Sequence, residues 1–241
     1  MTINENDFIL VKSKKYDKNK LIEILNFDKQ GKLLPKHKPQ ERLSDREKPE
    51  KKEVFDNSGK LIEVTYLRNK KFSCSHRYEY DNRGNEIIDT YVQVNPDYNQ
   101  QILSYYDENN RVTKIEFYEG IDKIFSGDAF YEWDTNGNNI VLIAHNSNGR
   151  LRYKYHNTFD NNKLAERKYF GGNGRLYWTQ FCVYNKEGFV IEKNTHDDKM
   201  LFHRIITTYD ENNNRVTSQT WIHKDYIKKW YAGKYLRYVW K

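Results

Sequence analysis

Apolar and polar residues alternate along most of this chain, in short runs that polar turns separate. In one run Phe72, Cys74, His76, Tyr78 and Tyr80 occupy every second position, and the residues between them are polar. A period of two is typical of a strand with one buried face. Further runs rich in β-branched and aromatic residues lie at 61–67, 87–92, 112–118, 140–145, 151–159, 190–195 and 216–222. Together these runs predict an antiparallel β protein.

A short motif marks the turns between these runs: an aromatic residue, then Asp or Asn, then polar residues that often include Gly. Successive copies follow each other at intervals of 25 to 28 residues. Such a regular interval is typical of repeat architectures, in which one supersecondary unit recurs along the chain. After a first copy at Phe27-Asp28, the copies are Phe55-Asp56, Tyr80-Asp81, Tyr106-Asp107, Trp133-Asp134, Phe159-Asp160, Tyr184-Asn185 and Tyr209-Asp210.

The chemistry of the motif favours a structural role. Asp bonds backbone N–H groups in tight turns, and Gly or Asn accepts the positive φ that such turns require. We expect the aromatic residues to form a ladder across neighbouring hairpins, because cross-strand aromatic pairs stabilise sheets. The alternative is a row of sugar-binding subsites, with Trp133 and Trp178 as candidate stacking residues.

The repeat predicts an all-β fold of antiparallel β-hairpins with a period of about 26 residues. Consecutive hairpins can extend one twisted sheet, wind into a solenoid or close into a barrel-like meander. We expect a single structural domain in three parts. Residues 1–54 hold irregular opening strands and a charged, Pro-rich loop at 35–52, residues 55–220 hold the repeats, and residues 221–241 form an aromatic and basic capping hairpin.

Composition predicts a thin interior and a solvated surface. The chain has 20 Tyr residues, only 37% apolar residues and a mean hydropathy of −1.03. Tyr buries its ring while its hydroxyl stays in water, which suits a sheet with much exposed area. The net charge of +7 comes from 41 basic and 34 acidic residues that are interspersed along the strands, which favours a solvated face over a nucleic-acid patch.

The first residues of the chain and its cysteines indicate a cytoplasmic location, or export without a classical signal. The first seven residues lack the basic start and apolar run of a signal peptide, and no window is apolar enough to span a bilayer. Cys74 and Cys182 are expected as small buried residues in a reducing compartment, and their spacing favours no disulfide.

The C-terminal segment interleaves aromatic and basic residues. We expect it to cap the last hairpin, with a turn at 232–234, because terminal repeats must cover the final apolar face. The alternatives are an interface with another protein, stacking of nucleic-acid bases, and contact with a membrane surface. The candidate partner-binding residues are Trp221, Tyr226, Trp230, Tyr231, Tyr235, Arg237 and Trp240.

No catalytic, metal or cofactor motif is found in the sequence. There is no P-loop, no nucleophile elbow and no CxxC pair, and the seven histidines are scattered. His145 and His156 flank a turn and can approach each other across a hairpin, but no third ligand is evident. We therefore expect a protein that is not an enzyme and that binds no cofactor or metal.

The turn motif also carries a resemblance. The phrases Tyr80-Asp81-Asn82-Arg83-Gly84-Asn85 and Trp133-Asp134-Thr135-Asn136-Gly137-Asn138 resemble the YD repeat of Rhs and teneurin proteins, and the short hairpin repeats of MORN-like bacterial antitoxin proteins. The resemblance covers residues 27 to about 216. It implies a bacterial, non-catalytic β-repeat protein that is associated with toxin systems.

Three hypotheses of function follow. The first is a cytoplasmic protein that binds another protein through its Tyr-rich sheet, as an immunity protein or antitoxin, with the toxin link implied by the resemblance alone. The second is a carbohydrate-binding module that uses its aromatic ladder. The third is nucleic-acid binding through the C-terminal segment, for which the modest charge excess gives little support.

Overall fold

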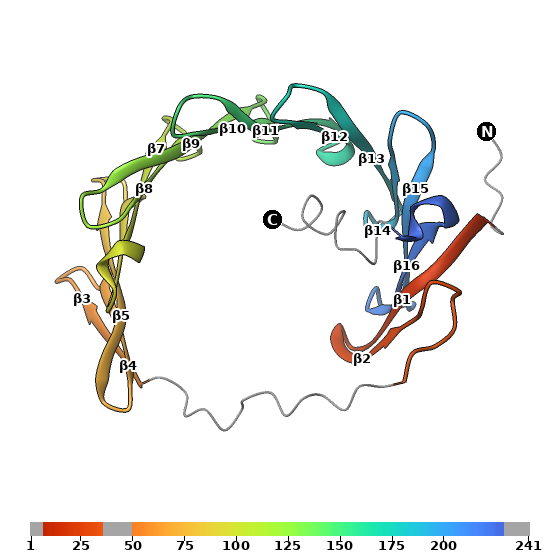
Figure 1. Ribbon diagram of the computed structural model, residues 1–241, viewed down its shortest axis with the longest axis horizontal. Coiled ribbons are helices and arrows are strands. Elements are labelled where there is room, and N and C mark those ends of the chain that lie inside the picture. The colour runs from red at the N-terminus through yellow and green to blue at the C-terminus, as the bar shows by residue number, and fades with distance from the viewer. Residues whose placement is uncertain (1–6, 36–49, 229–241) are drawn as a thin grey trace. The chain divides into compact units, whose positions relative to one another are not determined.

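The computed structural model describes residues 7–35 and 50–228, and most of them belong to sixteen β-strands (Figure 1). None of these residues belongs to a helix that is long and apolar enough to cross a membrane. The predicted all-β fold of antiparallel hairpins is thus confirmed. The elements are β1 (Phe8–Asp17), β2 (Lys20–Asn26), β3 (Glu50–Phe55), β4 (Leu61–Arg68), β5 (Lys71–Tyr80), β6 (Glu86–Gln93), η2 (Pro96–Tyr98), β7 (Gln100–Tyr106), β8 (Val112–Glu119), β9 (Ile124–Trp133), β10 (Asn139–Asn146), β11 (Leu151–Asp160), β12 (Lys163–Gly171), β13 (Leu176–Tyr184), β14 (Val190–His196), β15 (Leu201–Tyr209), β16 (Arg215–His223) and η3 (Lys224–Tyr226).

The strands lie in chain order from β3 to β16, and β1 and β2 are added beyond β16. β1 pairs antiparallel with β16, with Phe8 opposite His223 and Lys15 opposite Thr217. β2 and β3 each have a neighbouring strand on one side only, β1 and β4 respectively. Among the described strands the sheet is therefore open, and of the three assemblies expected from the repeat these strands do not form the closed one.

The chain divides into two compact units that interleave in the sequence. The first unit comprises Met1–Gln40, Asn157–Tyr169 and Leu176–Lys241, and it holds β1, β2, most of β12 and β13 to β16. The second unit comprises Glu41–His156 and Phe170–Arg175, and it holds β3 to β10 and most of β11. The first unit unites both ends of the chain because β1 pairs with β16.

Each unit has a thin interior, as the composition predicted. In the first unit Thr195, His203 and Ile222 form a cross-strand row on β14, β15 and β16 and are almost fully buried. In the second unit the small side chains of Ala129 and Ala144 face each other across β9 and β10, and both are buried. Apart from Ile222, these buried positions hold small or polar residues.

The observed strands extend the predicted runs by one or two residues, with two corrections at the borders of the repeats. The loop expected at 35–52 ends earlier, because residues 50–52 already belong to β3, where Glu50 lies opposite Leu67 and Lys52 opposite Thr65. An edge strand accepts such charged residues, since one of its sides faces solvent. Residues 221–223 complete β16 instead of opening a separate hairpin, and the turn expected at 232–234 lies outside the described residues.

Candidate functional site

The Asp residue of the turn motif organises its turn through its side chain and its backbone. Oδ1 of Asp134 accepts hydrogen bonds from the backbone N–H groups of Asn136 at 2.9 Å and Asn138 at 2.8 Å. The backbone of Asp134 donates to Asn138 and accepts from Gly137, which has a φ of +83°. This is a type I turn that closes with a left-handed residue, a common hairpin connection.

The same turn recurs along both units. Oδ1 accepts the N–H groups two and four residues on at Asp28, Asp56, Asp81, Asp107 and Asp210. Asn110 and Asn213 replace the glycine, with φ values of +60° and +62°. At Asp56 and Asp134 hydrogen bonds hold the pKa of the carboxyl group below the ordinary Asp value, most strongly the side-chain bonds with Ser58 and Asn138 respectively.

The aromatic residue before the Asp joins its hairpin to the preceding one. Its polar end donates a hydrogen bond to a backbone carbonyl at the start of the strand that follows the previous turn, about twenty residues earlier. The bonds run from Tyr80 to Leu61, Tyr106 to Glu86, Trp133 to Val112, Tyr184 to Leu164 and Tyr209 to Val190, at 2.7–3.1 Å. Each such bond contributes roughly 1 kcal/mol.

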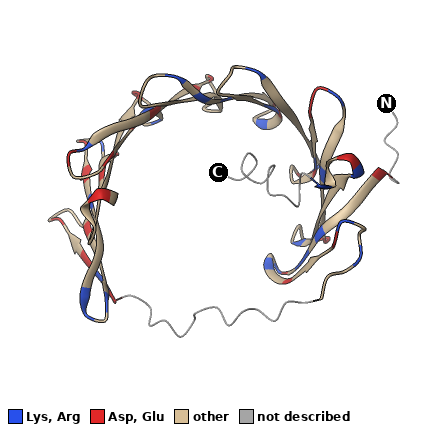
Figure 2. Cartoon of the chain, viewed as in Figure 1, with Lys and Arg blue, Asp and Glu red and all other residues tan. Residues whose placement is uncertain are grey.

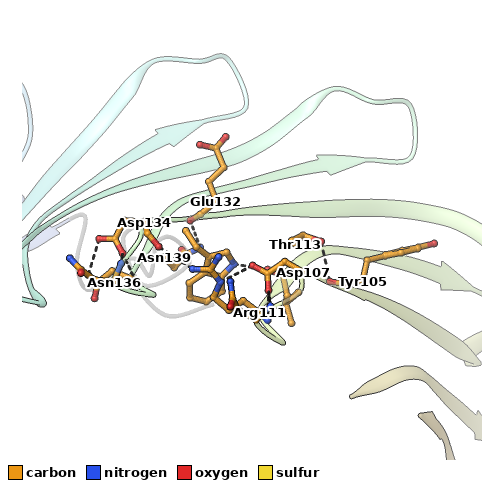
Figure 3. Close-up of polar contacts among 12 residues, drawn as sticks. Tyr105, Asp107, Arg111, Thr113, Glu132, Asp134, Asn136 and Asn139 are labelled. Atoms are coloured by element: carbon orange, nitrogen blue, oxygen red, sulfur yellow. Dashed lines mark hydrogen bonds and ion pairs between the residues drawn. The ribbon is translucent and has the colours of Figure 1, made fainter. Parts of the chain in front are cut away.

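Basic side chains add further contacts between neighbouring turns. Arg111 bonds Oδ2 of its own turn residue, Asp107, at 2.7 Å and donates to the carbonyl of Asp134 in the next turn at 3.0 Å (Figure 3). The Arg111 guanidinium also lies 5.9 Å from the ring centre of Trp133, and Lys60 lies 5.1 Å from that of Tyr80. Basic side chains, together with the hydrogen bonds from the Tyr and Trp rings, thus connect neighbouring repeats.

Three copies of the motif depart from this arrangement, because their aromatic residue is Phe27, Phe55 or Phe159, whose rings have no hydrogen-bond donor. Asp160 is the last residue of β11, and the turn after it has two residues, Asn161 and Asn162, with positive φ. Phe159-Asp160 thus also precedes a hairpin turn, as the motif predicted, but this turn is shorter than the others. Phe55, on the edge strand β3, has a ring without a donor and is more than half exposed.

The C-terminal candidates are separated by the structure. Trp221, on β16, is half-buried and lines a cavity of about 80 Å³ with Phe8, Arg204 and Ile206. Tyr226 is buried, donates a hydrogen bond to the Asp197 carboxylate and stacks on Phe202 at 5.1 Å, so it is an interior residue instead of a surface anchor. The other five candidates, Trp230, Tyr231, Tyr235, Arg237 and Trp240, lie outside the described residues.

Trp178 and His145, which the sequence suggested as sugar-stacking and metal-binding residues, instead make contacts within the fold. Trp178 is buried and stacks on Tyr169 with ring centres 5.2 Å apart, so it presents no free face to a sugar. His145 bonds Asp128 on β9 at 2.8 Å and does not pair with His156, which lies opposite Val141 near the other end of its hairpin. Within residues 7–35 and 50–228 no three His, Cys, Asp or Glu residues gather as metal ligands, and Cys74 and Cys182 are free thiols.

One surface feature was not selected from the sequence: the apolar edge of the first unit. β2 lies at this edge, and its side chains Leu21, Ile22 and Ile24 are 44%, 61% and 42% exposed. Leu33 and Leu34 are also exposed, and the N–H of Leu34 bonds the carbonyl of Asn26 at the end of β2. Monomeric proteins rarely leave so many large apolar side chains together in water.

Positive charge surrounds this apolar edge. Residues 8–34 carry seven Lys and three Asp or Glu, an excess of four positive charges against +7 for the whole chain. Figure 2 shows basic residues along this hairpin. The opposite edge strand, β3, is different, because its exposed residues are mostly charged and Lys51 pairs with Glu53 at 2.5 Å. Charged residues of this kind protect a sheet edge from pairing.

Comparisons with known proteins assign no family to the chain. No protein-family model and no curated protein matches it. Among solved structures it is similar to TcdB2-TccC3-Cdc42, with a TM-score of 0.35 and 15% identity over 69% of this chain and 10% of that one. It is also similar to TcdB2-TccC3 without its hypervariable C-terminal region (TM-score 0.30, 13% identity, 88% and 12% covered). A porin-like protein from Bacteroides uniformis gives a TM-score of 0.41 at 5% identity, with 90% and 95% covered.

The chain spans about a tenth of the length of the TcdB2-TccC3 chains. Similarities at these scores say nothing of a partner or an activity. The resemblance to YD-repeat and MORN-like proteins therefore stays a prediction from the turn motif.

Proposed function

We propose that this chain is a non-catalytic binding protein that holds an extended, acidic segment of another protein along the free edge of β2. The observation that carries the proposal is the cluster of exposed apolar side chains on this edge strand. The Tyr-rich sheet serves in this proposal as the scaffold that presents the edge.

An edge strand offers a partner its backbone. Apart from the carbonyl of Asn26, which accepts a hydrogen bond from Leu34, the N–H and C=O groups on the outer side of β2 face no strand in the described part of the chain. A polypeptide that adds to such an edge gains main-chain hydrogen bonds, and contacts with alternate side chains give specificity. Leu21, Ile22 and Ile24 supply apolar contacts of this kind.

The charge of the hairpin selects the chemistry of the partner. Seven lysines in residues 8–34 favour a segment with Asp or Glu beside its apolar residues. Complementary charge of this kind raises the rate of encounter and disfavours basic partners. Affinity therefore falls as the salt concentration rises.

The resemblance of the turn motif to YD-repeat and MORN-like proteins extends the proposal. In this extended proposal the partner is a bacterial toxin, and the chain acts in the cytoplasm as its immunity protein or antitoxin. The edge of β2 is then the surface on which the toxin is held.

The test is selection from a displayed library of random 12-residue peptides, followed by affinity measurements on selected sequences. We expect peptides in which apolar residues alternate and acidic residues flank them. The double variant Ile22→Ser and Ile24→Ser should bind at least tenfold more weakly, because it removes two apolar contacts and leaves the charge of the edge unchanged. Both residues are exposed, so the fold should be retained, as circular dichroism can check.

Val54→Ser on β3 is the matched control, because Val54 is an exposed apolar residue on the other edge strand. It should leave the affinity unchanged. Selected peptides that bind the double variant as tightly as the natural chain would overturn the proposal, as would a library that yields no binder.

A further inference from the structure

The second unit contains a pocket that the edge of β2 does not use. The pocket has a volume of about 520 Å³, within the range of roughly 300–1,000 Å³ typical of small-molecule sites. It lies on one face of β4, β5, β6 and β7. Its lining residues are Tyr66, Arg68, Ser73, Cys74, His76, Asp89, Tyr91, Gln100 and Ile102.

The register of the strands explains why these residues meet. Tyr66 lies opposite Cys74, and His76 lies opposite Tyr91, which in turn lies opposite Gln100. Side chains that oppose each other in a sheet point to the same face. Four adjacent strands therefore place their polar and aromatic residues around one hollow.

The floor of the pocket contains an ordered polar pair. Nδ1 of His76 lies 2.9 Å and 3.2 Å from the two carboxylate oxygens of Asp89. Because a carboxylate only accepts hydrogen bonds, Nδ1 of His76 is the donor in this pair. The ring centre of Tyr91 is 4.8 Å from that of His76, which fixes the ring further.

The hydroxyl group of Tyr91 also has a partner, the thiol of Cys74. Burial, followed by a hydrogen bond with the Cys74 thiol, raises the pKa of the Tyr91 hydroxyl. The ring is thus kept as a neutral, oriented wall of the pocket.

From this arrangement we infer that the pocket binds a saccharide. The Tyr66 and Tyr91 rings supply faces on which the C–H side of a sugar ring can stack. Donors and acceptors surround them on Arg68, Ser73, His76, Asp89 and Gln100. A sugar matches this mixture because each of its hydroxyl groups both donates and accepts.

Other ligand classes fit the lining less well. An apolar ligand would leave the polar groups of the pocket desolvated and without partners, which is unfavourable. A phosphate or a nucleotide calls for converging cations or N–H groups, and the lining holds one permanent cation, Arg68, against the Asp89 carboxylate. The near balance of charge points to a neutral or weakly acidic sugar.

The experiment is a screen of the full chain on a glycan array, followed by isothermal titration calorimetry with the best-bound oligosaccharide. We expect Asp89→Asn and Gln100→Ala each to weaken binding at least tenfold. Gln100 is exposed, so its substitution leaves the fold intact even where Asp89→Asn disturbs the His76 pair. Tyr98→Ala is the control, because Tyr98 is a 63% exposed aromatic residue in η2 that does not line the pocket.

Each outcome decides the inference. Binding that depends on Asp89 and Gln100 but not on Tyr98 supports it. An array without a bound glycan, or an affinity that neither substitution changes, overturns it. Binding of nucleotides in place of sugars in a parallel titration also overturns it, and none of these outcomes bears on the edge of β2.

Discussion

At the scale of single residues, the repeat depends on a few positions with special backbone geometry. The third residue after the turn Asp has positive φ in each regular turn, and the chain places Gly or Asn there. Gly137 illustrates the reason, because a Cβ added to it would meet no atom within 4 Å. Backbone conformation, and not space, selects the residue at this position.

Substitution of Gly137 separates conformation from packing. We expect Gly137→Ala to lower the free energy of unfolding by about 1 kcal/mol, since a left-handed conformation is unfavourable for Ala. Gly137→Asn should have a smaller effect, because Asn110 and Asn213 already occupy the equivalent position. Urea denaturation measures both variants, and an equal loss in the two would show that conformation is not the cause.

His203 predicts a pH dependence of stability. Burial lowers the pKa of this imidazole from 6.5 to about 4. Its cross-strand neighbours, Thr195 and Ile222, carry no charge. Between these pH values the unfolded chain binds the proton more readily, so this stability is fully present above pH 6.5 and is lost as the pH falls towards 4.

We expect the natural chain to lose about 2 kcal/mol of unfolding free energy between pH 7 and pH 5 through His203. His203→Gln removes this titration, so urea denaturation of the variant should give a smaller loss over the same range. The relevant quantity is the difference between the natural chain and the variant in how steeply the unfolding free energy changes with pH. Burial also lowers the pKa of His196, which adds a loss of the same sign to both proteins. Parallel slopes would contradict the expectation.

At the scale of the elements, the two strands of the N-terminal hairpin have different surroundings. β1 lies between β2 and β16, whereas β2 is at the edge of the sheet. Amide exchange measured by NMR should distinguish them. We expect the amides of β1 to be protected throughout, and alternate amides of β2 to exchange at least tenfold faster.

The other edge provides the internal comparison, since β3 should show the same alternation against β4. Protection of every β2 amide, with alternation kept in β3, would mean that the β2 edge is covered in solution. That result would count against a free binding edge.

The elements were largely predictable because their signals are local. Alternating residues in 72–80 and the Asp-Asn-Gly chemistry of turns such as Asp134 to Gly137 need no distant contact. The pairing of β1 with β16 was not predictable, since no local sequence signal in Phe8–Asp17 indicates which distant strand it pairs with. The pocket was missed for a related reason, because His76 and Asp89 meet only through the register of β5 and β6.

At the scale of the whole molecule, the chain combines two compact units with different surfaces. The first unit carries the apolar edge with its surrounding lysines, and the second carries the polar pocket. The modest net charge of +7 hides this difference, because more than half of it lies in residues 8–34. The two proposals can therefore be tested by separate variants of the same protein.

The pairing of β1 with β16 also means that β1 lacks one of its partner strands for most of the time during which the chain is synthesised. β1 leaves the ribosome before β16, because Phe8 and its partner His223 are more than two hundred residues apart in the sequence. At the usual rates of translation this interval is roughly 10 to 40 s. During that time the apolar residues Phe8 to Leu10 have no β16 to pack beside. The charged side chains of Lys12, Lys14 and Lys15 in the same strand oppose its aggregation until β16 has been synthesised.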